Sequence, residues 1–399
     1  MAEFPDNVAA GFAVHVEGQD VTANVSDFIQ SIEYESSDSI ADVMKIVVSN
    51  PDMVLSSSKI FQPYNEVSLW LGWGQKLSHI GRVVIVRPKI NFPEDGVPSL
   101  EIMGYSKDWV FAHKQPDPDE EGTVEKAKGQ KKKILTTFGD ITIGDAVAKI
   151  GSDLGLQTDV DPIDLDEVGN LDWPAGMTAA EYLRGLSNLT GFYMWVDADV
   201  KGVWTLHFKD PANILKNQVK RYKFKYGAKE LSTLMRFEPE MNFTEKFTKL
   251  RVQALGYYQT SEGIRWGTLG EDTIEVDDSP QAEDPLYAGD PKEDVKQFTS
   301  AEAVKLYVGD FSFAFSAAGN MNSMAKIKRW AKSWFARNRE NFMTGNGVVI
   351  GIENLMSRQE HDIEGLGPPY DGKWYFSRVR HLFGSEAGYT CDFSARKVV

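Results

Sequence analysis

The sequence predicts a mainly β protein with a small α+β insertion and one long helix in the C-terminal half of the chain. Three observations lead to this fold class. A strand module occurs near the start of the chain and again at its end, residues 12–110 carry strand-like alternation, and helical spacing is confined to 138–208 and 324–342. We therefore expect two related β-barrel domains with other material inserted between them.

The repeated module is a meander of hairpins in which a Gly-basic pair opens a strand that ends in arginine. The first copy reads LGWG (71–74), GRVVIVR (81–87) and LEIM (100–103), and the second reads LG (366–367), GKWYFSR (372–378) and YTCDF (389–393). Duplicated modules commonly lie side by side about a pseudo-symmetry axis. The alternative is that two unrelated meanders share glycines and alternating apolar residues by chance.

Length and cysteine content limit the number of domains and the ways in which they can be stabilised. With 399 residues, the chain is long enough for two or three domains with separate cores. Cys391 is the single cysteine, so an internal disulfide is excluded, and no Cys and His residues have zinc-site spacing. We expect synthesis in the cytoplasm, because residues 1–6 do not resemble a signal peptide and no apolar run is long enough to span a membrane.

The charge balance argues against a protein that wraps nucleic acid. There are 58 acidic and 43 basic residues, which give a formal net charge of -15. An acidic surface would let DNA pass without binding it. Aromatic residues make up 12% of the chain, and we expect some of them in subunit interfaces.

The first barrel domain is expected over residues 1–114, with strands at 12–16, 28–34 and 45–49. A charged linker follows at 115–137, where acidic residues give way to a run of lysines and nothing can fill a core. We interpret the lysine run as a solvated loop; a phosphate-binding patch is the alternative.

The α+β insertion is expected over residues 138–215. Apolar residues at helical spacing predict a helix from 143 to 154, with Thr142 as its N-cap and Gly155 at its end. Thr178 and Glu181 form a capping box for a second helix. A hairpin of residues 192–196 and 203–208 completes the domain.

The second barrel domain is expected over 216–270 and 295–399, interrupted by an acidic mobile loop at 271–294. A long helix at 324–342 carries Trp330 and Trp334 on one side and basic residues on the other. We expect its aromatic side to pack on the barrel, because a turn at 345–347 leads directly into a strand at 348–352. A membrane-surface helix is the alternative.

No catalytic, cofactor-binding or metal site is predicted. The histidines are scattered singly, without metal-ligand spacing, at His15, His79, His113, His207, His361 and His381. Cys391 with His381 is the one candidate thiol–imidazole pair, but no orienting third group is evident near it. The carboxylates at 360, 362 and 364 alternate along an extended segment and are expected on one solvated face, so they do not suggest a hydrolytic pair.

The C-terminal sequence GLG (365–367), YDGKWYFSRVRH (370–381) and GYT (388–390) resembles the closing signature of the phage late control D and baseplate hub family. That family is related to the body of type VI secretion spike proteins. The preceding helix, with Ala325, Ala331 and Ala336, lies where the family places one. The likeness extends over most of the chain, but its specific part is the C-terminal segment.

The resemblance implies two tail-tube-like β-barrel domains per chain and a homotrimer that presents six barrels in a ring. It also implies a structural, non-enzymatic symmetry adaptor of the virion tail baseplate, which joins a sixfold tail tube to a threefold spike. DNA would pass through its channel without specific binding, and assembly would occur in the host cytoplasm.

Partners follow from the same resemblance. They are a spike protein, a tail tube protein and, as further candidates, tape measure, baseplate wedge or peripheral hub proteins. The chain ends at Val399 without a lysozyme-like domain or a β-helix needle, so the resemblance implies a separate spike polypeptide. We expect the acidic 271–294 loop to be a docking site for that partner or for a baseplate neighbour. Two other hypotheses stay open: a cell-wall-binding or hydrolytic tail-tip protein, and a membrane-active component led by the 324–342 helix.

Overall fold

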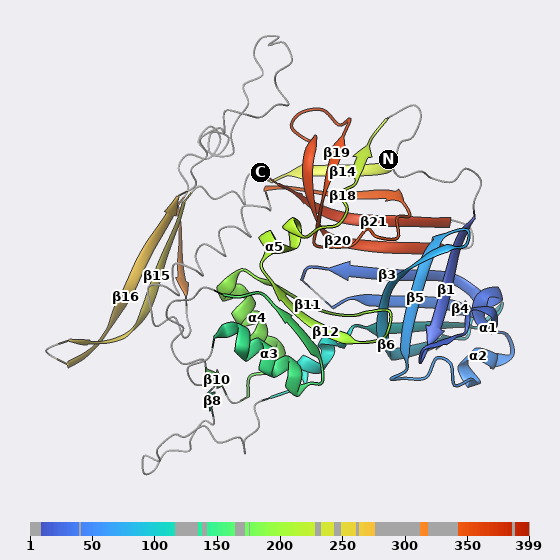
Figure 1. Ribbon diagram of the computed structural model, residues 1–399, viewed down its shortest axis with the longest axis horizontal. Helices are drawn as coiled ribbons and strands as arrows, with labels where there is room; N and C mark the ends of the chain where they lie inside the picture. The colour runs from blue at the N-terminus through green and yellow to red at the C-terminus, as the bar shows by residue number, and fades with distance from the viewer. Residues whose placement is uncertain are drawn as a thin grey trace, which may run out of the picture. The chain divides into compact units, whose positions relative to one another are not determined.

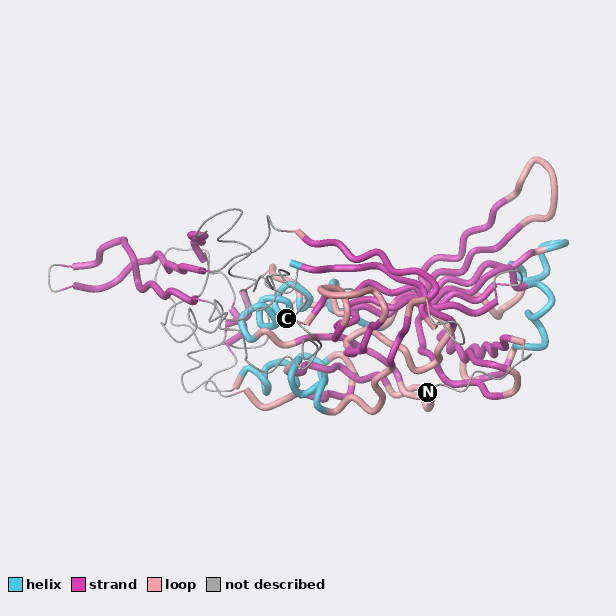
Figure 2. Tube along the Cα trace, turned by 90° about the horizontal axis from the view of Figure 1, so that it is seen from above, coloured by secondary structure: helices cyan, strands magenta, loops and turns pink. Residues whose placement is uncertain are grey.

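A computed structural model describes residues 9–39, 41–115, 135–137, 142–163, 172–174, 176–227, 233–242, 249–260, 263–275, 312–317, 342–384 and 388–398. Strands make up most of the regular structure in these ranges (Figure 2). The chain divides into a larger unit, which contains 1–187, 192–239 and 345–398, and a smaller unit that consists mainly of 240–344. The mainly β fold class is confirmed.

The N-terminal strands form one half of the main sheet of the larger unit (Figure 1). They alternate buried apolar and partly exposed side chains, as in Met44, Ile46 and Val48, because successive strand residues point to opposite faces. The strands are β1 (Ala10–Val16), β2 (Gln19–Asp20), β3 (Ile29–Ser37), β4 (Val43–Ser49), β5 (Glu66–Trp73), β6 (Lys76–Asn91) and β7 (Ser99–Tyr105). Between them lie the short helices α1 (Thr22–Val25) and α2 (Val54–Ser57) and the 3-10 turns Ser26–Phe28, Pro51–Met53 and Lys107–Ala112.

C-terminal strands continue this sheet. They are β13 (Lys223–Lys225), β14 (Leu234–Met241), β18 (Met343–Ile350), β19 (Gln359–Glu364), β20 (Gly372–Gly384) and β21 (Gly388–Lys397). The strand order is β14-β18-β21-β20-β3-β4-β7-β6-β5-β1-β2, with β19 paired to β20 and β13 paired to β19. The two ends of the chain therefore share one sheet.

Aromatic side chains fill the core of the C-terminal half. The rings of Phe376 and Phe393 stack with their centroids 4.2 Å apart, and Phe224 stacks on Phe376 at 5.9 Å. Trp374 is completely buried and meets the ring of Phe237 edge-on at 4.9 Å. Many of the aromatic residues noted in the composition thus stabilise the fold itself.

The α+β insertion has its predicted helices and hairpin. α3 (Ile143–Asp153) begins at a capping box of Thr142 and Asp145, and α4 (Ala179–Thr190) follows the predicted capping box of Thr178 and Glu181. The sheet pairs β11 (Tyr193–Ala198) with β12 (Trp204–Lys209), and β12 runs parallel to β9 (Gln157–Val160), which was not predicted. α5 (Pro211–Lys216) leads back to the main sheet.

Residues 135–137 were predicted as part of the charged linker, and this prediction is wrong. They form β8 (Leu135–Thr137), which pairs with β10 (Asp172–Pro174). The backbone hydrogen bonds of this pair extend across a long sequence separation, which composition alone does not indicate. Residues 116–134 of the predicted linker lie outside the described ranges.

The smaller unit contains a three-stranded sheet in the order β16-β15-β17. The strands are β15 (Lys249–Thr260), β16 (Gly263–Glu275) and β17 (Ser312–Ala317). Residues 271–275 of the predicted acidic loop belong to β16, and the rest of that loop lies outside the described residues. The predicted 324–342 helix also lies outside the described residues, except for Phe342. In the part of the chain that is described, no helix is both long enough and apolar enough to cross a membrane.

Candidate functional site

The strand order of the main sheet repeats. The N-terminal half contains the run β5-β6-β7-β4-β3, and the C-terminal half contains β19-β20-β21-β18-β14. In both runs an antiparallel meander of three consecutive strands is followed by two strands from earlier in the chain. The same pairing pattern has therefore formed twice.

The central strands of the two meanders match residue by residue. The pairing of β6 with β7 shifts register between Ile85 and Arg87, and that of β20 with β21 shifts between Phe376 and Arg378. A β-bulge thus occurs at the same position in the two copies, and the sequence match independently places Arg87 on Arg378. The predicted repeat is confirmed for these strands, and a chance likeness does not account for a shared bulge.

The first strand of the second copy was predicted incorrectly. Leu366 and Gly367 were matched to the end of a strand, but β19 ends at Glu364. In the pairing pattern, Glu66 lies opposite Val84 and Glu360 lies opposite Tyr375, so these two glutamates are the equivalent residues.

The Gly-basic pair of the motif has the same role in both copies. Arg82 forms an ion pair with Glu66 at 3.0 Å, and Lys373 forms one with Glu360 at 3.8 Å. The basic residue therefore ties the meander's central strand to its first strand. Glu360 is buried, so the predicted solvated carboxylate face is wrong at this position.

Strand β20 joins the two halves of the sheet. Its residues Arg378–Gly384 pair antiparallel with Ser31–Ser37 of β3 (Figure 1). Two ion pairs cross this junction, from Arg378 to Glu35 at 3.5 Å and from Arg380 to Glu33 at 3.9 Å. The junction is the place where the two copies meet.

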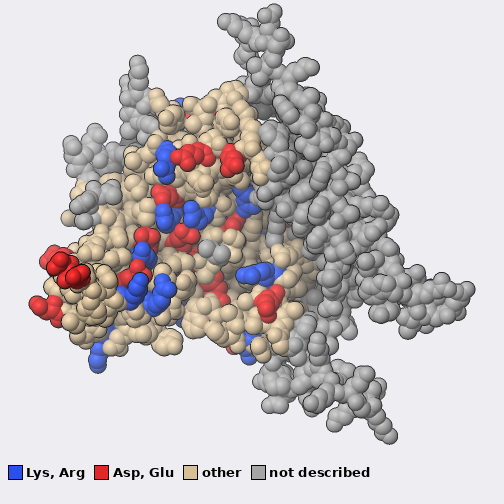
Figure 3. All heavy atoms as spheres, turned by 180° about the vertical axis from the view of Figure 1, so that it is seen from behind, with Lys and Arg blue, Asp and Glu red and all other residues tan. Residues whose placement is uncertain are grey.

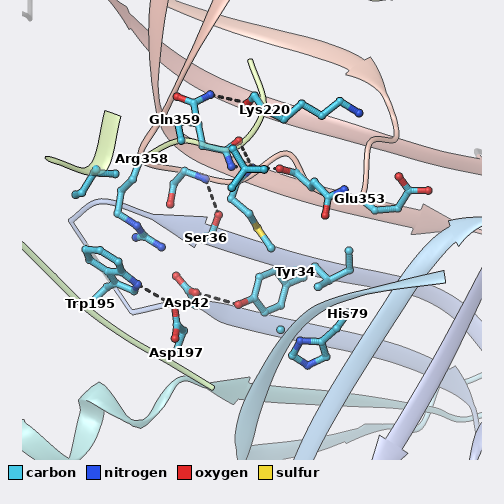
Figure 4. A pocket seen from close by; sticks show the side chains of 18 of the residues that line it. Tyr34, Ser36, Asp42, His79, Trp195, Asp197, Lys220, Glu353, Arg358 and Gln359 are labelled. Atoms are coloured by element: carbon cyan, nitrogen blue, oxygen red, sulfur yellow. Dashed lines mark hydrogen bonds between the residues drawn. The ribbon is translucent and has the colours of Figure 1, made fainter. Parts of the chain in front are cut away.

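A cavity of about 680 Å³ lies beside this junction (Figure 4). Strands β3, β6 and β11 contribute to its wall, together with the segments that flank β19 and follow α5. Its polar lining residues include Tyr34, Ser36, Asp42, His79, Asp197, Gln218, Lys220, Glu353, Ser357, Arg358 and Gln359. The α+β insertion and both halves of the main sheet thus border the same cavity.

The most perturbed carboxyl group of the cavity is Asp42. Its Oδ2 atom accepts a hydrogen bond from the Tyr34 hydroxyl at 2.9 Å, and its Oδ1 atom accepts one from the Ser37 backbone at 3.4 Å. Burial raises the pKa of Asp42 to about 7, although the Arg358 charge and the Tyr34 hydrogen bond oppose the shift. The group can therefore exchange a proton near neutral pH.

Arg358 links the insertion to the main sheet. Its guanidinium donates to the backbone oxygen of Ser37 and lies 4.5 Å from the ring centre of Trp195 on β11. The Trp195 indole donates to Asp197 at 2.9 Å, and Asp197 contacts His207 of β12 at 3.1 Å. These contacts hold the insertion against the junction.

The cavity offers hydrogen-bonding groups, two of which lack a partner. The Oγ atom of Ser357 and the Nε2 atom of His79 are buried and have no hydrogen-bond partner in the structure. Among the lining residues, all of which are described, no serine is hydrogen-bonded to a histidine. No group of three or more His, Cys, Asp and Glu side chains in the described ranges could hold a metal ion.

The thiol–imidazole pair weighed from the sequence does form, deep in the core. Cys391 Sγ lies 3.4 Å from His381 Nδ1, and the Tyr389 hydroxyl is 2.7 Å from the same nitrogen. The expectation that no third group lies nearby is therefore wrong. Burial raises the pKa of Cys391 to about 12 and lowers that of His381 to about 4, so both groups are neutral at pH 7 and out of reach of a substrate.

The surface charges do not separate into a basic and an acidic face on the side drawn in Figure 3. Lysine and arginine residues alternate with acidic residues over the described part of that side. This pattern gives no extended basic footprint for nucleic acid there.

Comparisons with solved structures identify the fold. The tail protein from Neisseria meningitidis matches with a TM-score of 0.62 and 11% sequence identity, over 98% of this chain and 96% of that chain. The 43 kDa tail protein of prophage MuSo2 from Shewanella oneidensis matches with a TM-score of 0.63 and 8% identity, over 97% and 98% of the two chains. An Escherichia coli protein described as a component of the type VI secretion system, with structural similarity to bacteriophage tail proteins, also matches. Its TM-score is 0.50 and its sequence identity is 9%, over 93% of this chain and 74% of that chain.

The chain therefore has the fold of phage tail and baseplate hub proteins, shared with proteins of the type VI secretion spike. No protein-family model matches the sequence, and no curated protein matches it.

Proposed function

We propose that this protein is a structural baseplate hub of a phage tail or a phage-like particle. The observation that carries the proposal is the repeat of one strand-pairing pattern, with a shared bulge, in two halves joined edge to edge by β20 and β3. Such a chain presents two equivalent modules side by side. The fold shared with tail proteins supports the same role.

In this proposal each half is a tail-tube-like barrel, and three chains form a ring with six modules. The ring matches a sixfold tail tube on one side and a threefold spike on the other, and DNA passes through its centre. The partners are a spike protein and a tail tube protein, and the location is the baseplate of the virion. Two modules per chain give this symmetry match because a threefold ring of duplicated units is approximately sixfold.

We further propose that the protein has no catalytic, cofactor or metal site and acts through its interfaces. The neutral, buried state of Cys391 and His381 supports this, as does the absence of a nucleophile–base contact among the described lining residues of the cavity. A hydrolytic or cell-wall-binding tail-tip protein would instead need a catalytic site or a binding site for the cell wall.

The test has two parts. Light scattering of the purified protein should give three times the mass of one chain, 44.7 kDa, and electron microscopy of the particles should show six similar densities around a threefold axis. A monomer, or a ring without internal sixfold character, would contradict the hub. Incubation with purified peptidoglycan should give neither retention nor turnover; either result would favour the tail-tip role.

A further inference from the structure

The two copies of the repeated module differ in one respect: a strand edge that is paired in the second copy is open in the first. In β20, residues beyond the bulge continue past the end of β19 and pair with β3. In β6, residues beyond the bulge continue past the end of β5, which pairs only as far as Val84. No strand of the described chain pairs with the outer edge of residues 86–91.

A second open edge lies on β14, the counterpart of β3. β3 pairs with β4 on one side and β20 on the other, whereas β14 pairs with β18 and, in the described ranges, with nothing on its other side. Met235, at the start of β14, is 56% exposed. An open edge with exposed apolar residues is a template for pairing with another chain, and of the residues on this edge Pro239 can only accept, because proline has no backbone N–H.

The register of the second copy shows which residues of β14 correspond to those of β3. A hydrogen bond from Gly351 N–H to Tyr389 O (3.0 Å) sets β18 against β21, and one from Asn242 N–H to Phe342 O (2.8 Å) sets β14 against β18. The shared bulge aligns the hairpin β6–β7 with the hairpin β20–β21. When the registers β21–β18 and β18–β14 are compared with the registers β7–β4 and β4–β3 from that starting point, β14 aligns with β3. The equivalent pairs are Phe237 with Ile32, Glu238 with Glu33, and Glu240 with Glu35.

The charges on the two open edges repeat those of the junction inside the chain. At the junction, Arg378 and Arg380 of β20 form ion pairs with Glu35 and Glu33 of β3. The same alignment places Arg87 and Lys89 at the positions of Arg378 and Arg380 on β6. Glu238 and Glu240 take the places of the β3 glutamates on β14, where Glu238 also lies 3.7 Å from Arg236 of its own strand. The positions that correspond to the junction's ion pairs are therefore basic on one open edge and acidic on the other.

An exposed aromatic ring marks the same position. Phe383 of β20 packs edge-on against Phe12 with ring centroids 5.1 Å apart, and so is covered by the other half of the sheet. Its counterpart is Phe92, which directly follows β6 and is 60% exposed, and nearby Ile90 of β6 is 39% exposed. These apolar groups lie where the equivalent groups of the second copy are covered.

We propose that residues 86–91 of β6 pair antiparallel with β14 of a second copy of this chain, in the register of the β20–β3 junction. Arg87 and Lys89 then face Glu240 and Glu238 of the neighbour, and Asn91 lies directly opposite its Glu238. The contact is head-to-tail, so each copy uses one edge of each kind, and in the proposed trimer the rotation between copies closes these contacts into a ring. The inference deepens the proposed hub by naming the surfaces that join its copies, and it rests on that proposal only for the number of copies.

Cysteine cross-linking of the full-length chain tests the register. Asn91→Cys combined with Glu238→Cys should form intermolecular disulfides under mild oxidation and give a ladder on a non-reducing gel that ends at the closed ring. Cys391 is buried and serves as a silent background thiol. The pairing of Asn91→Cys with Met235→Cys, three residues out of register, should cross-link at least tenfold less.

Charge reversal tests the edges independently of cross-linking. Arg87→Glu with Lys89→Glu should lower the mass in light scattering to that of one chain, 44.7 kDa, and so should Glu238→Lys with Glu240→Lys, because like charges would then face each other across the strand pair. The fourfold variant that carries both exchanges should assemble again. Lys201→Glu with Lys216→Glu makes the same charge change on exposed residues away from both edges and should leave the mass unchanged.

The outcomes separate this inference from the proposed function. An unsubstituted trimer whose mass survives both reversals, and whose in-register cysteines do not cross-link, would overturn the interface and leave the hub standing. A cross-linked ring with a copy number other than three would support the interface and contradict the trimer. A chain that stays monomeric and gives no cross-link would overturn both.

Discussion

The hydroxyl group of Tyr34 donates a hydrogen bond of 2.9 Å to the carboxyl group of Asp42, and both side chains are buried beside the cavity. The backbone N–H of Asp42 also donates to Ser106 Oγ at 3.1 Å. Asp42 therefore holds the loop between β3 and β4 next to the place where β20 joins the sheet. Its ionisation links the pH of the solution to the stability of the junction.

Asp42→Asn should change how stability depends on pH. The folded-state pKa of about 7 lies above the ordinary value of 3.8, so the folded protein keeps a proton that the unfolded chain releases, and this contribution to stability falls as pH rises from about 4 to 7. The full effect is on the order of 4 kcal/mol. Urea denaturation at several pH values should show a less negative slope in this window for Asp42→Asn than for the parent protein. Asp153→Asn, exposed on α3, is the control and should keep the parent slope.

His381 should have the opposite effect in acid. Its Nε2 is 2.8 Å from the Leu355 backbone oxygen, and burial lowers its pKa to about 4 from the ordinary value of 6.5. The unfolded chain takes up the proton first, so stability is lost as pH falls from about 6.5 to 4. His381→Gln should be less stable than the parent at pH 7 and should lose less stability over that range. The exposed His113→Gln variant is the control. If the denaturation midpoints of His381→Gln shift with pH as much as those of the parent and of this control, His381 is not the source of the acid dependence.

Gly81→Ala should destabilise the protein strongly. A Cβ atom at this position would lie 2.2 Å from the Tyr34 hydroxyl oxygen and 2.3 Å from the ring carbon that bears it, so the buried ring would have to move. We expect a loss of about 2–3 kcal/mol in thermal or urea unfolding, as for overpacking of a core. Gly185→Ala, where a Cβ meets nothing within 4 Å on helix α4, should instead stabilise by about 0.5–1 kcal/mol. Equal effects at the two positions would contradict the packing argument.

Glu66→Gln should loosen the attachment of the α+β insertion. The carboxylate accepts from the Trp204 indole of β12 at 3.0 Å and pairs with Lys107 at 2.7 Å as well as with Arg82. Removing the charge leaves two partly buried cations without their counter-ion, at a cost of roughly 1–3 kcal/mol. Hydrogen exchange should become faster in β12 while β4 and β7 keep their protection. Glu101→Gln, whose contacts to Lys45 and Arg87 are both 3.8 Å long, should leave exchange in β12 unchanged.

Local signals in the sequence predicted the elements of the insertion well. Thr142 and Thr178 cap their helices as expected, because the capping side chain and the N–H groups it binds lie within one turn of each other. The strand β9 was missed because its parallel partner, β12, lies far along the chain. Residues 135–137 were assigned to a linker for the same reason: their partner, β10, is distant in sequence.

The cavity could not have been found from the sequence. Asp42, Trp195 and the adjacent pair Ser357 and Arg358 come from three separate segments, and none of these segments carries a recognisable motif. The raised pKa of Asp42, the stacking of Arg358 on Trp195 and the missing partner of the Ser357 hydroxyl arise from burial, which depends on how the insertion packs against the sheet. The contact between Cys391 and His381 was foreseeable as a pair, but its burial and the role of Tyr389 were not.

The alternation of side chains and the Gly-basic motif were enough to establish a mainly β chain with a duplicated hairpin, because strand periodicity and turn chemistry are local properties. The bulge that confirmed the duplication, the β20–β3 junction and the difference between its paired and unpaired edges arise only on folding. Which strand lies beside which is decided by backbone hydrogen bonds between residues hundreds of positions apart, and those bonds place Arg378 against Glu35 while leaving the equivalent edge of β6 open.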